Sequence, residues 1–187
     1  MKTSVTALVL ALMTLTGCSD SPSLHYYQLA QVPAVNAPNA ADAPVLVVEN
    51  VMVADFLDSN ALVLQRSDVE LVRAQQNLWV EPLGSQLSRN LRASIQQQLP
   101  AVRIASQAPA SPHARLLVQV EQFHGSEAGQ VLIKVRYSLM HNGQIQQFDY
   151  QWQQAQPEDG YASLVQSLST GWQTVATEIS QRIQPLL

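Results

Sequence analysis

Apolar and polar residues recur with two different periods along this chain, and the period of three to four residues predicts two helices. From Tyr161 to about Ile183 the apolar residues follow the spacing of one wide helical face. A first helix is predicted from Pro82 to about Leu99, because proline suits a first helical turn and Pro100 stops the helix. Its apolar residues recur every four positions, which favours packing in the core, although a helix face that binds a partner would have the same spacing. That stripe consists of Leu83, Leu87, Leu91, Ile95 and Leu99.

The period of two residues predicts strands. Three alternating stretches, around 116–121, 131–139 and 148–152, indicate a β-meander, and Asn142-Gly143 between the last two is a strong hairpin signal. Further strands are expected at 24–29, 45–51, 62–65, 69–73 and 102–105. The order of strands, helix, strands and helix predicts an α+β fold, with an antiparallel or mixed β-sheet and two main helices packed on one face.

The first twenty residues predict export and lipidation. Residues 5–15 are nearly all apolar but too short to span a bilayer, which is typical of a signal peptide. Leu15-Thr16-Gly17-Cys18 resembles the bacterial lipobox, in which cleavage falls between Gly17 and Cys18 and the cysteine carries an S-diacylglycerol and an N-acyl group. An ordinary secreted protein with an incidental cysteine is the alternative, but no second cysteine is present for a disulfide.

This assignment divides the chain into a signal peptide at 1–17, a short lipidated tether at 18–23, and a single periplasmic α+β domain at 24–187. Within the domain, residues 31–44 are rich in Ala, Pro and Asn and predict an extended loop. Asp20 lies one position beyond the place where aspartate retains enterobacterial lipoproteins in the inner membrane, so we expect the outer membrane.

Charge and motifs exclude several function classes. The net charge is −4 and the basic residues are scattered, so no nucleic-acid surface is expected. The four histidines have no metal-ligand spacing, and no nucleophile motif or phosphate loop is present. Asp55 and Asp58 could be paired carboxylates, but Asp58-Ser59-Asn60 favours a turn. We therefore expect no enzyme activity, no metal and no cofactor beyond the covalent lipid on Cys18.

The stretch Trp79-Val80-Glu81-Pro82 before the first helix has two interpretations. Trp79 could close the core while Glu81 stabilises the positive end of the helix dipole. Alternatively, Trp79 could anchor a contact surface, because aromatic residues are enriched at interface hot spots.

Several segments together resemble the ABC-type transport auxiliary lipoproteins. They are Tyr27-Gln28-Leu29, the stretch 51–58 with Phe56-Leu57-Asp58, the stretch 62–66 ending in Arg66, and Trp79-Val80-Glu81-Pro82-Leu83. The resemblance covers about 25–185, and the Trp-x-Glu-Pro-Leu segment is its most specific part.

This resemblance implies a non-enzymatic subunit of an MCE-type intermembrane lipid transport system that supports envelope integrity. It would sit in the outer membrane and dock the periplasm-spanning MCE-domain protein and its inner-membrane partners, with a homo-oligomeric ring as one arrangement. Trp79, Glu81, Pro82 and Phe56 are the candidate interface residues. The alternatives are an outer-membrane scaffold or activator of cell-wall synthesis, which usually carries a long linker, and an enzyme such as a lipid hydrolase.

Overall fold

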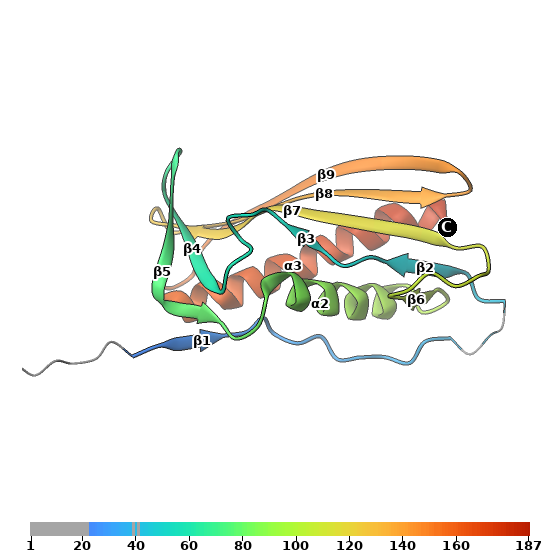
Figure 1. Cartoon of the computed structure of the whole chain (residues 1–187), viewed down its shortest axis with the longest axis horizontal. Coiled ribbons are helices and arrows are strands. Elements are labelled where there is room, and N and C mark those ends of the chain that lie inside the picture. The colour runs from blue at the N-terminus through green and yellow to red at the C-terminus, as the bar shows by residue number, and fades with distance from the viewer. Residues whose placement is uncertain (1–22, 39, 41) are drawn as a thin grey trace, which may run out of the picture.

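The computed structural model describes residues 23–38, 40 and 42–187, and over these residues the chain forms one mixed sheet with two long helices on one face (Figure 1). The helices are α2 (Leu83–Gln98) and α3 (Tyr161–Ile183), followed by the short 3₁₀ helix η2 (Gln184–Leu186). The strands are β1 (His25–Tyr27), β2 (Val45–Val48), β3 (Met52–Val53), β4 (Ala61–Ser67), β5 (Glu70–Trp79), β6 (Arg103–Ala105), β7 (Ala114–Ser126), β8 (Gln130–His141) and β9 (Gln144–Ala155). The predicted α+β class with both helices on one face is confirmed.

Strand β7 lies at the centre of the sheet and pairs with strands on both of its edges. Along one edge it pairs with β8, which pairs with β9, and both pairings are antiparallel, so the predicted meander is confirmed. Along its other edge β7 meets β2, β3 and β4 in succession, all parallel. The sheet extends from there through β6 beside β2, and through β5 and β1 beside β4. The β8–β9 turn has positive φ at Asn142 and Gly143, which explains why this residue pair occupies it.

The two faces of the meander differ in chemistry. Alternate residues of β8 are buried beneath the helices, and the aromatic residues of β9 continue this inner face, where Tyr137 stacks on Phe148 with ring centroids 5.1 Å apart. The outer face carries a chain of ion pairs in which Glu121 bridges Lys134 at 2.8 Å and Arg136 at 3.1 Å. Alternation with a period of two therefore separates an apolar face from a charged one.

Both helices bury apolar stripes against this inner face. The predicted stripe of α2 is confirmed, because all its members are buried. Helix α3 comes close to the sheet at Gly171, where an added Cβ would lie 2.6 Å from the Trp152 ring and 2.7 Å from Ile133 Cδ1. The indole Nε1 of Trp172 donates a 3.2 Å hydrogen bond to the Leu87 carbonyl oxygen, which joins α3 to α2.

Several predicted strand limits are wrong. The stretch expected as one strand at 45–51 forms β2 and β3 with a break at 49–51, where the Val51 N–H donates to Ser88 Oγ instead of to a strand. The piece expected at 69–73 belongs to the ten-residue strand β5, and Val69 lies in the turn before it. Strand β1 is limited to three residues of the expected six. Local sequence could not set these limits, because each depends on which distant strand lies alongside.

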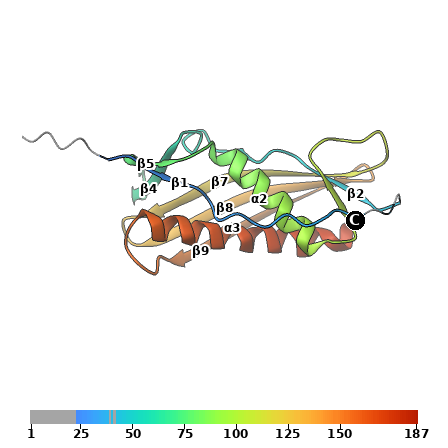
Figure 2. The ribbon, with the colours of Figure 1, turned by 90° about the horizontal axis from the view of Figure 1, so that it is seen from below.

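The loop expected at 31–44 has no helix or strand among its described residues, and it does not project from the domain. Residues 28–38, here called the strap, run across the helices on the side opposite the sheet (Figure 2). Helix α2 is therefore covered on two sides, by the sheet and by the strap.

Candidate partner-binding surface

Three of the four predicted interface residues, Trp79, Glu81 and Pro82, lie at the junction between β5 and α2, whereas Phe56 lies in the loop between β3 and β4. Trp79 is the last residue of β5 and is only 4 % exposed. Its ring lies 6.4 Å from the Phe123 ring, which in turn lies 6.1 Å from Trp172, so the three rings cross the core as a row. Trp79 thus closes the core, and its side chain supports the surface above it.

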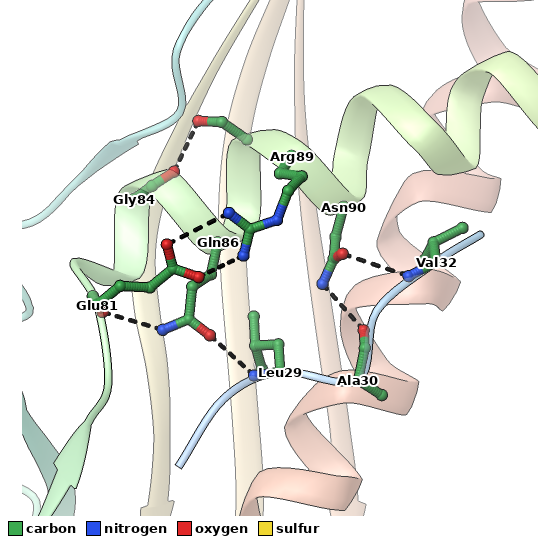
Figure 3. Close-up of polar contacts among 9 residues, drawn as sticks. Leu29, Ala30, Val32, Glu81, Gly84, Gln86, Arg89 and Asn90 are labelled. Atoms are coloured by element: carbon green, nitrogen blue, oxygen red, sulfur yellow. Dashed lines mark hydrogen bonds and ion pairs between the residues drawn. The ribbon is translucent and has the colours of Figure 1, made fainter. Parts of the chain in front are cut away.

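Glu81 precedes α2 and pairs with the helix without capping it. Its carboxylate accepts hydrogen bonds from both terminal nitrogens of Arg89, one of them at 3.2 Å, while its backbone oxygen accepts from Gln86 Nε2 at 3.0 Å (Figure 3). The hydrogen bond from Arg89 lowers the pKa of the Glu81 carboxyl below its usual range. Glu81 forms no side-chain cap on α2, which has no side-chain cap hydrogen bond and no acidic residue in its first turn.

Pro82 and Phe56 are both more exposed than Trp79. Pro82 stands immediately before α2 and is exposed, beside a hollow of about 480 Å³ that it shares with residues 50–53 and Ser85. The floor of this hollow is tight, since a Cβ on Gly84 would come within 3.1 Å of the Val51 carbonyl oxygen. Phe56 is half-buried, with its ring 6.4 Å from the ring of the buried His124.

A second, larger hollow of about 950 Å³ lies between α2 and the strap. Its apolar side comes from Val32, Pro33 and Val35 of the strap, and its polar side comes from Arg89 and Arg92 of α2. The two hollows share Asn50, Ser85 and Ser88, so they adjoin along the first turns of α2. Together we call them the α2 surface, and its exposed members at the start of α2 are Pro82, Ser85 and Arg89.

Arg92 differs from the other arginines that line or border this surface. Its Nε donates to the Val48 carbonyl oxygen at 3.0 Å and one terminal nitrogen donates to Asn50 Oδ1 at 2.7 Å, so both acceptors are neutral. Burial lowers the pKa of this guanidinium, although a guanidinium stays charged at any physiological pH. A fixed positive charge thus stands in the wall of the larger hollow.

Three buried amide side chains of α2 hold the neighbouring backbone in place, and the sequence analysis assigned them no role. Gln86 Oε1 accepts from the Leu29 N–H at 2.8 Å, and Asn90 accepts from Val32 and donates to Ala30 (Figure 3). Gln96 in the same way pairs with both Val102 and Ile104, next to β6. Their spacing along one side of α2 was the signal that could have identified them, because amides on one helix face suit a backbone segment that lacks strand partners.

The lipid attachment site and the cleavage site, Cys18 and Gly17, lie outside the described residues, as do the signal peptide and most of the tether. Within residues 23–38, 40 and 42–187, no group of three or more His, Cys, Asp or Glu side chains could hold a metal ion. None of the helices described here is long and apolar enough to cross a membrane. His124 is a buried strand residue.

Comparisons with known proteins agree with the resemblance noted in the sequence. Residues 27–180 match the family of the ABC-type transport auxiliary lipoprotein component. The chain is 36 % identical to the intermembrane transport lipoprotein PqiC of Escherichia coli (strain K12) over 181 residues, which cover 96 % of this chain and 97 % of that protein. PqiC of Shigella flexneri gives the same values.

Two crystal structures share the fold. One, of an uncharacterised protein, has a TM-score of 0.78 and 36 % identity, and the match covers 86 % of this chain and 99 % of that one. The other, of a protein from Xanthomonas campestris, has a TM-score of 0.65 at 18 % identity, covers 83 % and 92 % of the two chains, and shows the fold alone. Sequence match, identity and fold agree, and the chain belongs to the ABC-type transport auxiliary lipoprotein component family.

Proposed function

We propose that this chain is an outer-membrane-anchored periplasmic lipoprotein subunit of an MCE-type intermembrane lipid transport system. In this role it docks the periplasm-spanning MCE-domain protein and acts by binding, without catalysis. The observation that carries the proposal is the α2 surface, where two adjoining hollows of about 950 and 480 Å³ lie over a well-packed helix. The printed name of the PqiC relatives, an intermembrane transport lipoprotein, supports the same assignment.

The chemistry of the α2 surface suits a protein partner. Its apolar strap residues and the exposed Pro82 provide contact area, and Arg89 and Arg92 provide two guanidinium groups at its centre. Arginine and apolar side chains in a hollow are features of interface hot spots. Trp79, Phe123 and Trp172 beneath this region keep the underlying core rigid, which lowers the entropy lost on docking.

The alternative of a cell-wall scaffold needs a long linker, and the strap is not free to act as one. Its backbone is bonded to α2 through Gln86 and Asn90 and to α3 through Ser169, whose Oγ accepts from the Ala30 N–H at 3.0 Å. The five residue-to-residue steps from Cys18 to Ser23 then bound the reach of the anchor to about 17 Å. A domain held this close to its anchor suits a docking subunit at the membrane.

A ring of identical subunits is part of this proposal, and strand β9 supports it. Among the described strands, β9 pairs only with β8, so one long edge of twelve residues is open. It contains no proline and no lysine, the residues that usually block pairing at an edge. Native mass spectrometry of the lipidated protein tests the ring, and a monomer at all concentrations contradicts it.

A photo-crosslinking amino acid at Ser85, in the hollow beside Pro82, tests the docking assignment in native envelopes. We expect it to capture the MCE-domain protein, identified by mass spectrometry of the crosslinked product. The same probe at Gln151, exposed on β9 and distant from α2, is the matched control and should not capture it.

Other outcomes separate the alternatives. Capture of cell-wall synthases at Ser85 replaces the docking proposal by the scaffold one. Labelling of the pure protein by a serine-reactive probe contradicts a purely binding role and revives the hydrolase hypothesis. Equal capture from Ser85 and Gln151 removes the α2 surface as the docking site.

A further inference from the structure

Large apolar side chains that remain exposed are concentrated at one end of the molecule. Eight are exposed in the described part of the chain, and five of these belong to β1, β5 or the residues that adjoin them. These five are Leu24, Tyr26, Val69, Leu71 and Val80. The helix layer and the meander together contribute only Ile145. A cluster of this kind on a single domain marks a surface that meets something apolar.

Strand pairing brings three of the five together. Strands β1 and β5 are parallel neighbours with Tyr26 opposite Leu78, and the backbone continues extended to Val80, whose N–H donates to Tyr27 at 2.9 Å. Side chains alternate across a strand, so Tyr26 and Val80 point away from the side on which Trp79 enters the core. They are 59 % and 56 % exposed, against 4 % for Trp79.

The other two lie at the far end of the same strand. Val69 occupies the turn between β4 and β5 and is 96 % exposed, with Leu71 two residues beyond it. Strand β5 spans ten residues, so the two apolar groups are separated by at most about 30 Å. In Figure 1, β5 stands across the end of the molecule, from β1 at the bottom to the β4–β5 turn at the top. Both groups therefore lie along the same end of the molecule.

The charges at this end are largely paired. Arg66, beside the β4–β5 turn, bonds to Glu70 and to Glu127, each at 2.9 Å. No excess of basic side chains is present to select an anionic surface, since Asp68 adds a further negative charge to the turn. The end is thus apolar at two places and close to neutral or slightly acidic between them.

The N-terminal residues connect the lipid anchor proposed at Cys18 to this end of the molecule. Only four residues stand between Cys18 and Ser23, and Ser23 is two residues before β1, so a lipidated cysteine lies within about 17 Å of the first described residue. Any bilayer that holds the lipid is within the same distance of β1.

We propose that the end formed by β1, β5 and the β4–β5 turn, here called the β5 end, rests on the lipid surface to which Cys18 is anchored. Leu24, Tyr26 and Val80 insert beside the anchor, and Val69 and Leu71 insert at a second point. Shallow insertion of apolar side chains, added to an acyl anchor, fixes orientation in a way that a tether alone does not. The domain then stands upright, with the β8–β9 turn and the C-terminus directed away from the membrane.

The inference rests on the lipid anchor of the proposed function, but not on docking of an MCE protein. It is tested with the lipidated protein in phosphatidylcholine vesicles. The chain has one cysteine, whose sulfur is alkylated after lipidation, so an introduced cysteine is the sole thiol for an environment-sensitive dye. The labelled variants are Tyr26→Cys and Val69→Cys, with Ile145→Cys as the control because it is similarly exposed but lies beside the β8–β9 turn.

A spin-labelled lipid in the bilayer then quenches only dyes that touch the membrane. We expect most of the emission to be lost at positions 26 and 69 and to be retained at 145. Equal quenching at all three positions, or quenching at 26 alone, overturns the two-point contact. If the protein fails to float with the vesicles, the anchor itself is absent, and both this inference and the membrane-anchored function are contradicted.

A second pair of variants separates insertion from proximity. With the dye on Asp68→Cys, the double substitution Val69→Ser and Leu71→Ser should abolish quenching, because the apolar contact beside the dye is lost. The matched double substitution Met52→Ser and Ile145→Ser removes two exposed apolar side chains elsewhere and should leave quenching intact. Unchanged quenching in the first pair overturns the inference. The inference is also overturned if, in detergent, the dyes at these positions become more shielded from water as the protein concentration rises. That result would assign the β5 end to contacts between copies of the chain.

Discussion

Helices α2 and α3 pack side by side on the same face of the sheet, yet they bury polar groups for different reasons. In α3 the buried Ser169 and Ser180 donate to carbonyl oxygens four residues earlier in their own helix, and Ser169 also accepts from the Ala30 N–H of the strap. In α2 the buried Gln86, Asn90 and Gln96 reach out of the helix to backbone groups of other segments. Helix α3 is a covering helix with one exposed side, whereas α2 is enclosed by the sheet and the strap.

This difference predicts which contacts stabilise the whole domain and which determine the shape of the α2 surface. The apolar contacts of α3, centred on Trp172, hold the two layers together. The polar contacts of α2 decide where the strap and the start of β6 lie, and with them the two hollows of the α2 surface. A change in α3 should therefore weaken the whole domain, and a change in the amides of α2 should loosen one surface.

The largest effect is expected for Trp172→Ala in α3. The substitution removes a fully buried indole and leaves the Leu87 carbonyl oxygen without its partner, so we expect a loss of about 3–5 kcal/mol in the free energy of unfolding. Urea denaturation followed by circular dichroism measures it. Trp172→Phe keeps most of the packing and should lose clearly less, and an equal loss for both would assign the effect to the hydrogen bond.

A smaller and more local effect is expected for Gln86→Ala in α2. The Leu29 N–H and the Glu81 carbonyl oxygen lose their partner, which costs about 1–3 kcal/mol because Leu29 is buried. Amide hydrogen exchange should accelerate at Leu29 more than in β7 or β8. Gln98→Ala, on an exposed position of the same helix, is the control and should change neither quantity. Uniform acceleration over the sheet would contradict the local role.

Two buried serines provide a matched comparison of the helices. Ser88 of α2 donates to the Gly84 carbonyl oxygen at 2.6 Å and also accepts from the Val51 N–H at 2.8 Å, whereas Ser180 of α3 donates only to Ala176 at 2.8 Å. We expect Ser88→Ala to lower the free energy of unfolding by about 1 kcal/mol and Ser180→Ala to change it by less than about 0.5 kcal/mol. Equal losses in thermal or urea unfolding would remove the distinction between the two helices.

The smallest effect is expected from the Glu81–Arg89 pair at the start of α2. The hydrogen bond from Arg89 holds the folded pKa of Glu81 below its unfolded value, so its stabilisation is present above about pH 4.3 and is lost as the pH falls through the lowered pKa. Both side chains are partly exposed, and solvent screening limits the contribution to less than about 1 kcal/mol.

Glu81→Gln should therefore flatten the dependence of unfolding free energy on pH between 7 and 3, and Arg89→Ala should bring the pKa of Glu81 back towards its usual range in an NMR titration. Glu158→Gln serves as the control, because Glu158 is exposed and forms no ion pair within the described part of the chain. A pH profile that is the same for all the variants would show that the pair is not maintained in solution.

The local sequence pattern was sufficient to predict those elements whose packing partners are their neighbours in sequence. The α3 limits, the three strands of the meander and the Asn142-Gly143 turn were predicted because short-range periodicity and turn chemistry determine them. The first helix was placed within one residue at each end. The split of 45–51 into β2 and β3, and the length of β5, depend on parallel pairing with distant strands and could not be predicted.

The candidate surface was predicted in position but not in composition. The segment Trp79-Val80-Glu81-Pro82 does lie beside a hollow, yet Trp79 supports it from below and Glu81 bonds along the helix instead of capping it. The strap and the arginines of α2 were missed, because a polar helix face looks the same in sequence whether water or another segment covers it.

The amino-acid sequence alone determined the α+β class, the two helices, the meander and the family, since these depend on short-range periodicity and on motifs, and it predicts the lipobox at Cys18. Only the tertiary structure decided that 28–38 is a strap, that α2 is enclosed on two sides, and that exposed apolar residues gather at the β5 end. The physical reason is that burial and hydrogen-bond partners of a residue depend on segments distant in the chain, which contribute nothing to its local pattern.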